Sequence, residues 1–162
     1  MSDARTLRLA HFDITPDKVE AFVLYQRTLL RSLMDASGED WAGRFAFAHA
    51  KALKESKLDP LDQKRIAADA ASFCGRRSAL AEVKARIREL NQHRPNLNAK
   101  EHALLERAPT ELARLEDLSE LEATLGAVTL ASFRAREVEL LELHRAVASA
   151  EGRGHLHPRN AN

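Results

Sequence analysis

The sequence predicts an all-α protein, a mainly antiparallel bundle of roughly four to five helices. Ala and Leu, both strong helix formers, supply about a third of the 162 residues, whereas β-branched and aromatic residues are sparse. Apolar residues recur at helical spacing between start and stop signals. Because the connections between these segments are short, neighbouring helices are expected to be antiparallel, and a coiled-coil rod is disfavoured.

The chain length favours a single domain. At 162 residues the chain is long enough to bury one hydrophobic core. We expect an N-terminal arm at 1–14, one helical-bundle domain at 15–150 and a disordered tail at 151–162. The tail is predicted because Gly152 and Gly154 interrupt the helical pattern there.

The first helix is predicted to begin after Thr15 and to end near residue 36, ahead of Ser37 and Gly38. Thr15 suits the N-cap, Pro16 suits the first helical position and Asp17 favours the positive end of the helix dipole. This combination is the clearest start signal in the chain.

One polar residue, Gln26, falls in the apolar seam of this first helix, between Phe22 and Leu29 and next to Tyr25. A polar residue in such a seam can fix helix register or the choice of partner. It can equally lie at the boundary of the core, which is the commoner case.

A second helix is expected from about residue 40 to residue 57. Its buried face follows the i, i+4, i+7, i+11 pattern of an amphipathic helix, with Trp41, Phe45, Ala48 and Ala52.

The third helix is predicted to open at Asp59-Pro60 and to reach residue 92. Ile66, Phe73 and Leu80 recur every seven residues, which is typical of long helices packed at shallow angles. Gly75 lies inside this run, so two shorter helices are the alternative.

The fourth helix is predicted from Asn98, which forms a capping box with Glu101, to about residue 117. Pro109 lies within it and predicts a kink. Ser119 and Glu122 then form a second predicted capping box.

Gly126 suits the position just past the end of the helix that follows Ser119. A last helix is expected at about 128–150.

Composition and charge disfavour several classes of protein. The net charge is only +1, so nothing draws the whole chain toward nucleic acid or an anionic membrane. The single cysteine, Cys74, excludes an internal disulfide framework. The polar N-terminus has no signal peptide pattern, and no run approaches the ~20 apolar residues of a membrane span. A cytoplasmic protein is expected.

Helical bundles often hold paired metal ions, which require Glu-x-x-His on two helices. That pattern is absent from the sequence. A looser metal site is conceivable from His49, Glu137 and His144, because Glu137 and His144 lie two turns apart on one helical stripe. The alternative, which we favour, is that these side chains flank the core and bond to water or to neighbouring helices.

An enzyme is not expected, and neither is a cofactor. The sequence has no Gly-rich phosphate loop, no zinc-protease helix and no nucleophile elbow. Cys74 follows Phe73 in the core stripe of the third helix, so a buried structural thiol is favoured over a catalytic one.

Charged residues are segregated along the chain. Residues 51–88 carry an excess of Lys and Arg, and residues 101–122 an excess of Asp and Glu. Such segregation can steer an oppositely charged partner or support self-association. It also fits antiparallel helices that complement each other inside the fold, which is the favoured interpretation. Nucleic-acid binding by the basic stretch is disfavoured because it lacks interleaved aromatic residues.

The leading hypothesis is a non-enzymatic protein-binding helical bundle, acting as an adaptor, regulator or assembly subunit, with homodimerisation as one form of this role. It rests on the absence of chemical motifs, the segregated charge and the amphipathic helices. The alternative is a small-ligand- or metal-binding bundle with a site between helices, using His49, Glu137 and His144 if the ligand is a metal.

Overall fold

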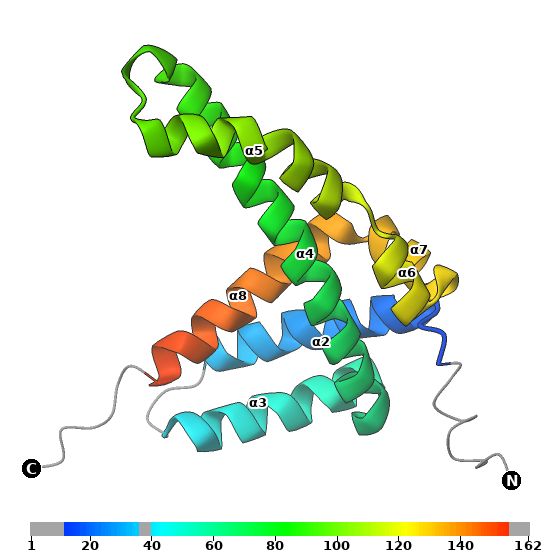
Figure 1. The fold of residues 1–162 in the computed structure, drawn as a ribbon. Helices are drawn as coiled ribbons and strands as arrows, with labels where there is room; N and C mark the ends of the chain where they lie inside the picture. The colour runs from blue at the N-terminus through cyan, green and yellow to red at the C-terminus, as the bar shows by residue number, and fades with distance from the viewer. Residues whose placement is uncertain (1–11, 36–39, 156–162) are drawn as a thin grey trace, which may run out of the picture.

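The computed structural model describes residues 12–35 and 40–155, and these residues are almost wholly helical, with no strand among them. The all-α prediction is therefore confirmed (Figure 1). The α-helices are α2 (Pro16–Asp35), α3 (Trp41–Ser56), α4 (Pro60–Gln92), α5 (Ala99–Glu116), α6 (Ser119–Leu125), α7 (Ala127–Ala135) and α8 (Glu137–His155), and a short 3₁₀ helix, η1 (Arg94–Asn96), connects α4 to α5.

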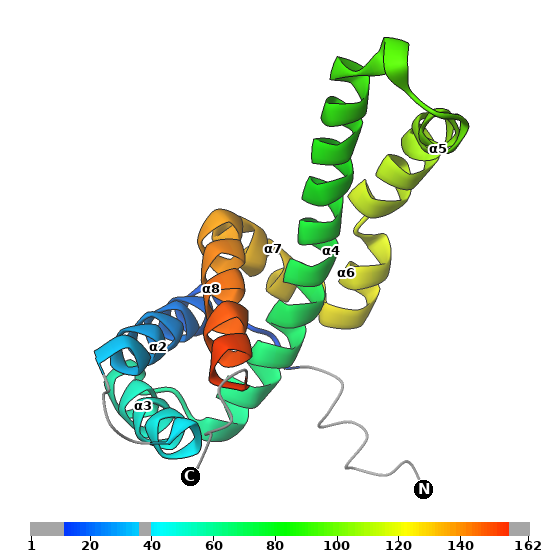
Figure 2. The ribbon, with the colours of Figure 1, turned by 90° about the vertical axis from the view of Figure 1, so that its left-hand side faces the viewer.

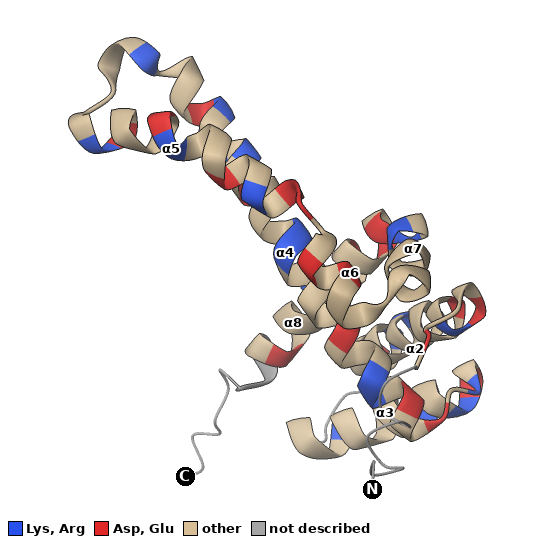
Figure 3. Ribbon diagram, turned by 45° about the vertical axis from the view of Figure 1, so that its right-hand side comes forward, with Lys and Arg blue, Asp and Glu red and all other residues tan. Residues whose placement is uncertain are grey.

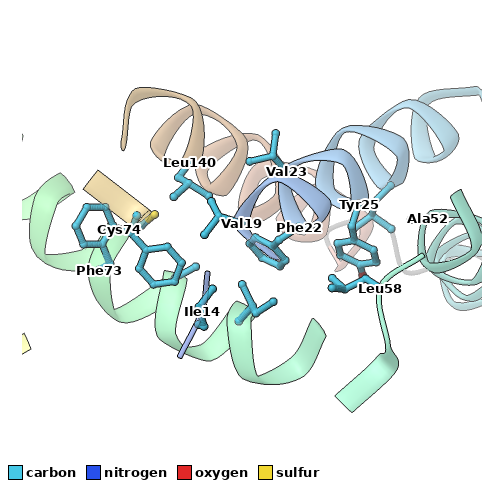
Figure 4. Packing of buried hydrophobic residues seen from close by; sticks show 14 of the residues in the cluster. Ile14, Val19, Phe22, Val23, Tyr25, Ala52, Leu58, Phe73, Cys74 and Leu140 are labelled. Carbon is cyan, nitrogen blue, oxygen red and sulfur yellow. The ribbon is translucent and has the colours of Figure 1, made fainter. Parts of the chain in front are cut away.

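A helical body forms around α2. Helices α2 and α3 run antiparallel side by side, and α8 and the first half of α4 pack across them (Figures 1 and 2). Large side chains from α2, α4, α7 and α8 fill its centre, where the rings of Phe73 and Phe133 lie 5.6 Å apart. Figure 4 shows Phe22, Phe73 and Leu140 among the side chains that fill this core. The apolar seam noted around Gln26 in the first helix, with Phe22 and Leu29, is thus on the face that α2 buries.

The second half of α4 extends away from the body, and α5 returns along it (Figures 1 and 2). Helix α4 is continuous through Gly75, so the single long third helix is confirmed. Leu80 and Leu90 on α4 and Ala108 and Leu115 on α5 are buried, yet they do not belong to the core cluster of the body. The protein therefore has a body core and a separate, smaller core in what we call the α4–α5 hairpin.

Most predicted helix starts are confirmed at atomic detail. The Asp59 carboxylate accepts hydrogen bonds from the first turn of α4, and the Asp40 carboxylate accepts one from the Gly43 N–H of α3 at 2.7 Å. Asn98 and Glu101 form both hydrogen bonds of the predicted capping box. Polar side chains thus satisfy the free N–H groups at these helix ends.

The capping box predicted at Ser119 and Glu122 is wrong. Ser119 is the first helical residue of α6, and its neighbour Leu118 occupies the N-cap with no side-chain hydrogen bond. The carboxylate of Asp117 instead accepts a hydrogen bond from the Ser119 N–H at 2.9 Å. A carboxylate two residues earlier therefore competes successfully for the N–H group and the hydroxyl of the serine.

The helix predicted at 128–150 is two helices. Arg136 separates α7 from α8, and its N–H group bonds to the carbonyl of Phe133, one residue short of the α-helical partner. The Arg136 guanidinium also pairs with Glu20 at 3.4 Å and with Glu139 at 3.1 Å. Because no Gly or Pro marks this break, the local sequence gave no signal for it.

Helix α8 runs to His155, so residues 151–155 are helical and the prediction of a disordered tail from residue 151 is wrong for them. The rest of that predicted tail, at 156–162, and most of the predicted N-terminal arm lie outside the described residues. Of the arm, Phe12 packs against the core, with the Lys18 ammonium 4.0 Å from the centre of its ring.

Candidate functional site

A cavity of about 180 Å³ lies in the body between α2, α3, α4 and α8. Its wall combines aromatic and small apolar side chains with a few polar groups, which is the usual make-up of a ligand pocket. The residues that line it are Phe22, Tyr25, Gln26, Leu29, Phe45, Gln63, Ala67, Ala70, Ala71, Cys74, Leu140, His144, Val147 and Glu151.

Gln26 is the buried polar residue of this wall. It is only 8% exposed, and its side-chain carbonyl oxygen has no hydrogen-bond partner among the described residues. Leaving a buried acceptor unpaired costs about 1–3 kcal/mol. The predicted seam position of Gln26 is therefore confirmed, and its amide is a group that a bound molecule or water would satisfy.

Tyr25 and His49 connect α2 to α3 beside the cavity. The Tyr25 hydroxyl lies 2.6 Å from Nδ1 of His49, and the two rings meet edge to face at 5.7 Å. Burial first, and then the negative charge of Glu151, raise the pKa of the Tyr25 phenol from 10.0 to about 12. The phenol is therefore neutral at physiological pH.

The three residues considered as metal ligands have separate surroundings. His49 is bonded to Tyr25, and Glu137 accepts a hydrogen bond from Nε of Arg77 at 2.6 Å. His144 lines the cavity. In the part of the chain that the structure describes, no cluster of three or more metal-ligating side chains occurs. The structure thus gives His49 and Glu137 other partners and does not bring the three together.

Cys74 is buried and lines the same cavity. Burial raises the pKa of its thiol to about 11, with a further upward contribution from Glu137 that Arg145 partly offsets. A thiol with so high a pKa stays protonated at neutral pH and is a poor nucleophile. The expectation that Cys74 is buried is confirmed.

The segregated charges pair inside the fold. Along the α4–α5 hairpin, Lys84 pairs with Glu116 at 2.7 Å and Arg86 with Glu101 at 3.6 Å. Arg76 donates to the backbone carbonyl of Asp117, at the end of α5. Figure 3 shows basic and acidic residues on the two facing helices of the hairpin. Internal pairing therefore accounts for much of the charge pattern.

The α4–α5 hairpin retains unpaired charge and exposed apolar surface. Its Ile87 and Leu112 line a shallow hollow together with Lys84 and Arg88. Leu104 is 53% exposed. Several basic residues of the hairpin form no ion pair within the described chain. These are Arg88, Arg94, Lys100 and Arg107.

Comparison with protein-family models, curated proteins and solved structures gave no match to this chain. Among the helices of residues 12–35 and 40–155, none is long and apolar enough to cross a membrane.

Most of the cavity wall is not evident from the sequence. Gln26 and Tyr25 stand out there as a seam feature but not as part of a site, and Glu151 falls in the predicted tail. No local pattern relates Arg77 to Glu137. A helix extended by one turn at its C-terminus would have placed Glu151 one turn beyond Val147, on the face of α8 that lines the cavity.

Proposed function

We propose that this protein is a non-enzymatic binding protein, an adaptor, regulator or assembly subunit that holds a protein partner on the α4–α5 hairpin. The observation that carries the proposal is the hairpin itself, which extends from the body as two helices with its own small core (Figure 2). An extended two-helix arm leaves its outer faces free to pack against another helix.

The chemistry of the hairpin surface favours an acidic amphipathic helix as the partner. The hollow at Ile87 and Leu112 accepts apolar side chains, while Arg88 at its edge has no ion pair within the described chain. Arg107 and Lys100 add further unpaired positive charge to the same arm. An apolar stripe flanked by carboxylates complements both features, with the charges speeding association and fixing the partner's orientation.

Substitutions on the hairpin test this proposal. Leu104→Glu and Arg88→Glu change exposed residues, so the fold is expected to survive, and circular dichroism checks that it does. The matched controls are Val138→Glu, at a residue that is 72% exposed on α8, and Arg31→Glu on α2. We expect a partner captured from cells that produce the protein to be lost with both hairpin variants and kept with both controls.

Purified components then give the decisive measurement. The dissociation constant of the captured partner should rise about tenfold or more with each hairpin variant and should also rise with salt. A partner that binds all four variants equally would contradict the proposal. The proposal would also be contradicted if no captured protein required the hairpin for its binding.

A second copy of the chain is one partner that this surface can hold. Sedimentation across a salt series identifies that case, because a dimer formed through the hairpin dissociates in Leu104→Glu but not in Val138→Glu. The proposal includes a cytoplasmic location, which agrees with a single cysteine that is free and buried.

A further inference from the structure

We propose that the cavity between α2, α3, α4 and α8 is a binding site for a small organic amine in its protonated form. This site is in the body and does not depend on the α4–α5 hairpin, so it is tested independently of the protein-binding role.

The size of the cavity sets the size of the ligand. Its volume is about 180 Å³. An apolar cavity of about 150 Å³ in another protein holds one benzene molecule. The cavity therefore has room for one aromatic or short aliphatic group that carries a small polar head.

The electrostatics of the wall favour a positive head group. Glu151 is the one carboxylate among the lining residues, and no Lys or Arg lines the cavity. Tyr25 and Cys74 are neutral at physiological pH, since their ordinary pKa values of 10.0 and 9.0 lie above it and burial raises both. The field of Glu151 reaches the interior, since it contributes to the raised pKa of the Tyr25 phenol.

The aromatic residues of the wall suit the same ligand. The rings of Phe22 and Tyr25 are stacked 6.0 Å apart, and Phe45 lines the cavity from α3. Aromatic faces bind apolar groups and attract cations through the ring quadrupole. An aryl or alkyl ammonium therefore meets complementary surface at both its ends.

Gln26 supplies the directional contact. Its buried side-chain carbonyl has no hydrogen-bond partner in the described chain, and the residue lines the cavity. An ammonium group donates up to three hydrogen bonds, so it supplies the donor that this oxygen lacks. The imidazole of His144 is a further lining group within the polar part of the wall.

The cavity is also accessible. Ala71 on α4 and Glu151 on α8 are exposed, and Gln63 and His144 are half-buried, so the wall reaches the surface between these two helices. A ligand can enter there without opening the core at Phe73.

Titration calorimetry with three matched probes tests the proposal on the full chain. Benzylamine, benzyl alcohol and benzoate share one ring and differ in charge. We expect one benzylamine to bind per chain, about tenfold more tightly than benzyl alcohol, and benzoate not to bind. Absence of benzylamine binding at millimolar concentration, or equal affinity for all three probes, would overturn the proposal.

Variants then assign the binding to this cavity. Gln26→Leu and Ala70→Leu should each weaken benzylamine binding about tenfold or more, the first by removing the amide and the second by filling the space. Glu151→Gln should remove the preference for the amine over the alcohol, whereas Glu142→Gln, on the same helix outside the cavity, should leave it unchanged. Because residue 151 is exposed, the Glu151→Gln variant retains the fold even if a core variant does not.

One outcome would show that the cavity holds water only. The parent protein would then bind none of the three probes, and its nuclear magnetic resonance signals from the cavity residues would not shift with benzylamine. That result contradicts the amine site and leaves the hairpin proposal untouched. A folded Gln26→Leu variant would show in addition that the fold does not need this amide.

Discussion

The hydroxyl of Tyr25 on α2 lies 2.6 Å from Nδ1 of His49 on α3. It is a side-chain hydrogen bond between the two helices that pack most extensively against each other. Tyr25 is only 3% exposed, so its hydroxyl depends on this bond for a partner.

Tyr25→Phe is expected to lower the free energy of unfolding by about 1 kcal/mol, because the hydrogen bond is lost and Nδ1 of His49 is left unpaired. Urea denaturation measures the change. A double-mutant cycle with His49→Phe isolates the pair and should give a coupling energy of about 0.5–1.5 kcal/mol. Additive effects of the two substitutions would show that the contact contributes nothing.

Stability should fall at alkaline pH. The pKa of the Tyr25 phenol in the folded protein is about 12 against an ordinary value of 10.0, and that of the Cys74 thiol is about 11 against 9.0. Since both pKa values are raised in the folded protein, the stabilisation that each neutral group gives the fold is complete below the ordinary pKa of that group. It is lost as the pH rises through 9–11 for Cys74 and 10–12 for Tyr25.

Cys74→Ala tests the first of these windows. The variant should lose less stability than the parent between pH 9 and pH 11, whatever its stability at pH 7. Urea midpoints measured at intervals across this range give the comparison. Parallel curves for parent and variant would contradict the assignment.

The ion pair between Arg77 and Glu137 joins α4 to α8, and each side chain is only 23% exposed. Glu137→Gln should lower the free energy of unfolding by about 1–3 kcal/mol, since the guanidinium loses its charged partner in a partly buried place. The control is Glu116→Gln, which removes the exposed pair with Lys84 and should cost less than about 1 kcal/mol.

Glu137→Gln has a second readout. Because Glu137 contributes to the raised pKa of the Cys74 thiol, its neutralisation should lower that pKa. The rate of thiol modification against pH reports the change. An unchanged profile would mean that burial alone sets the reactivity of Cys74.

Gly75→Ala is expected to stabilise the protein by about 0.5–1 kcal/mol, because glycine in a helix interior carries an entropic cost and an added Cβ at this position meets open space. Thermal and urea denaturation measure the gain. The opposite result is expected for Gly126→Ala, where φ is +86° and a side chain is strained. A destabilised Gly75→Ala variant would imply that α4 needs a bend at this residue.

Local signals in the sequence predicted the helices well where polar caps and prolines mark them. Asp59 and Asn98 cap α4 and α5 as expected, because a capping hydrogen bond joins residues only two or three positions apart. The break at Arg136 was not predicted, since neither Gly nor Pro marks it, and the Arg136 guanidinium pairs with Glu20 on a helix far away in the sequence. Tertiary contacts of this kind leave no trace in a local pattern.

The cavity was predictable only in part. Gln26 stood out as a polar residue in an apolar seam, but its neighbours across the cavity come from three other helices. Their meeting depends on how α4 and α8 cross α2, which periodicity does not specify. The same limit applies to His49 and Glu137, whose partners Tyr25 and Arg77 lie on other elements.

Helix α4 has 33 residues and so spans about 50 Å at the usual rise of an α-helix. Its first half carries Ala67 and Cys74 in the cavity wall, and its second half carries Leu80 and Leu90 in the hairpin. With no break between the halves, one continuous helix builds both the cavity wall and the hairpin, so the two share a single backbone element (Figure 1).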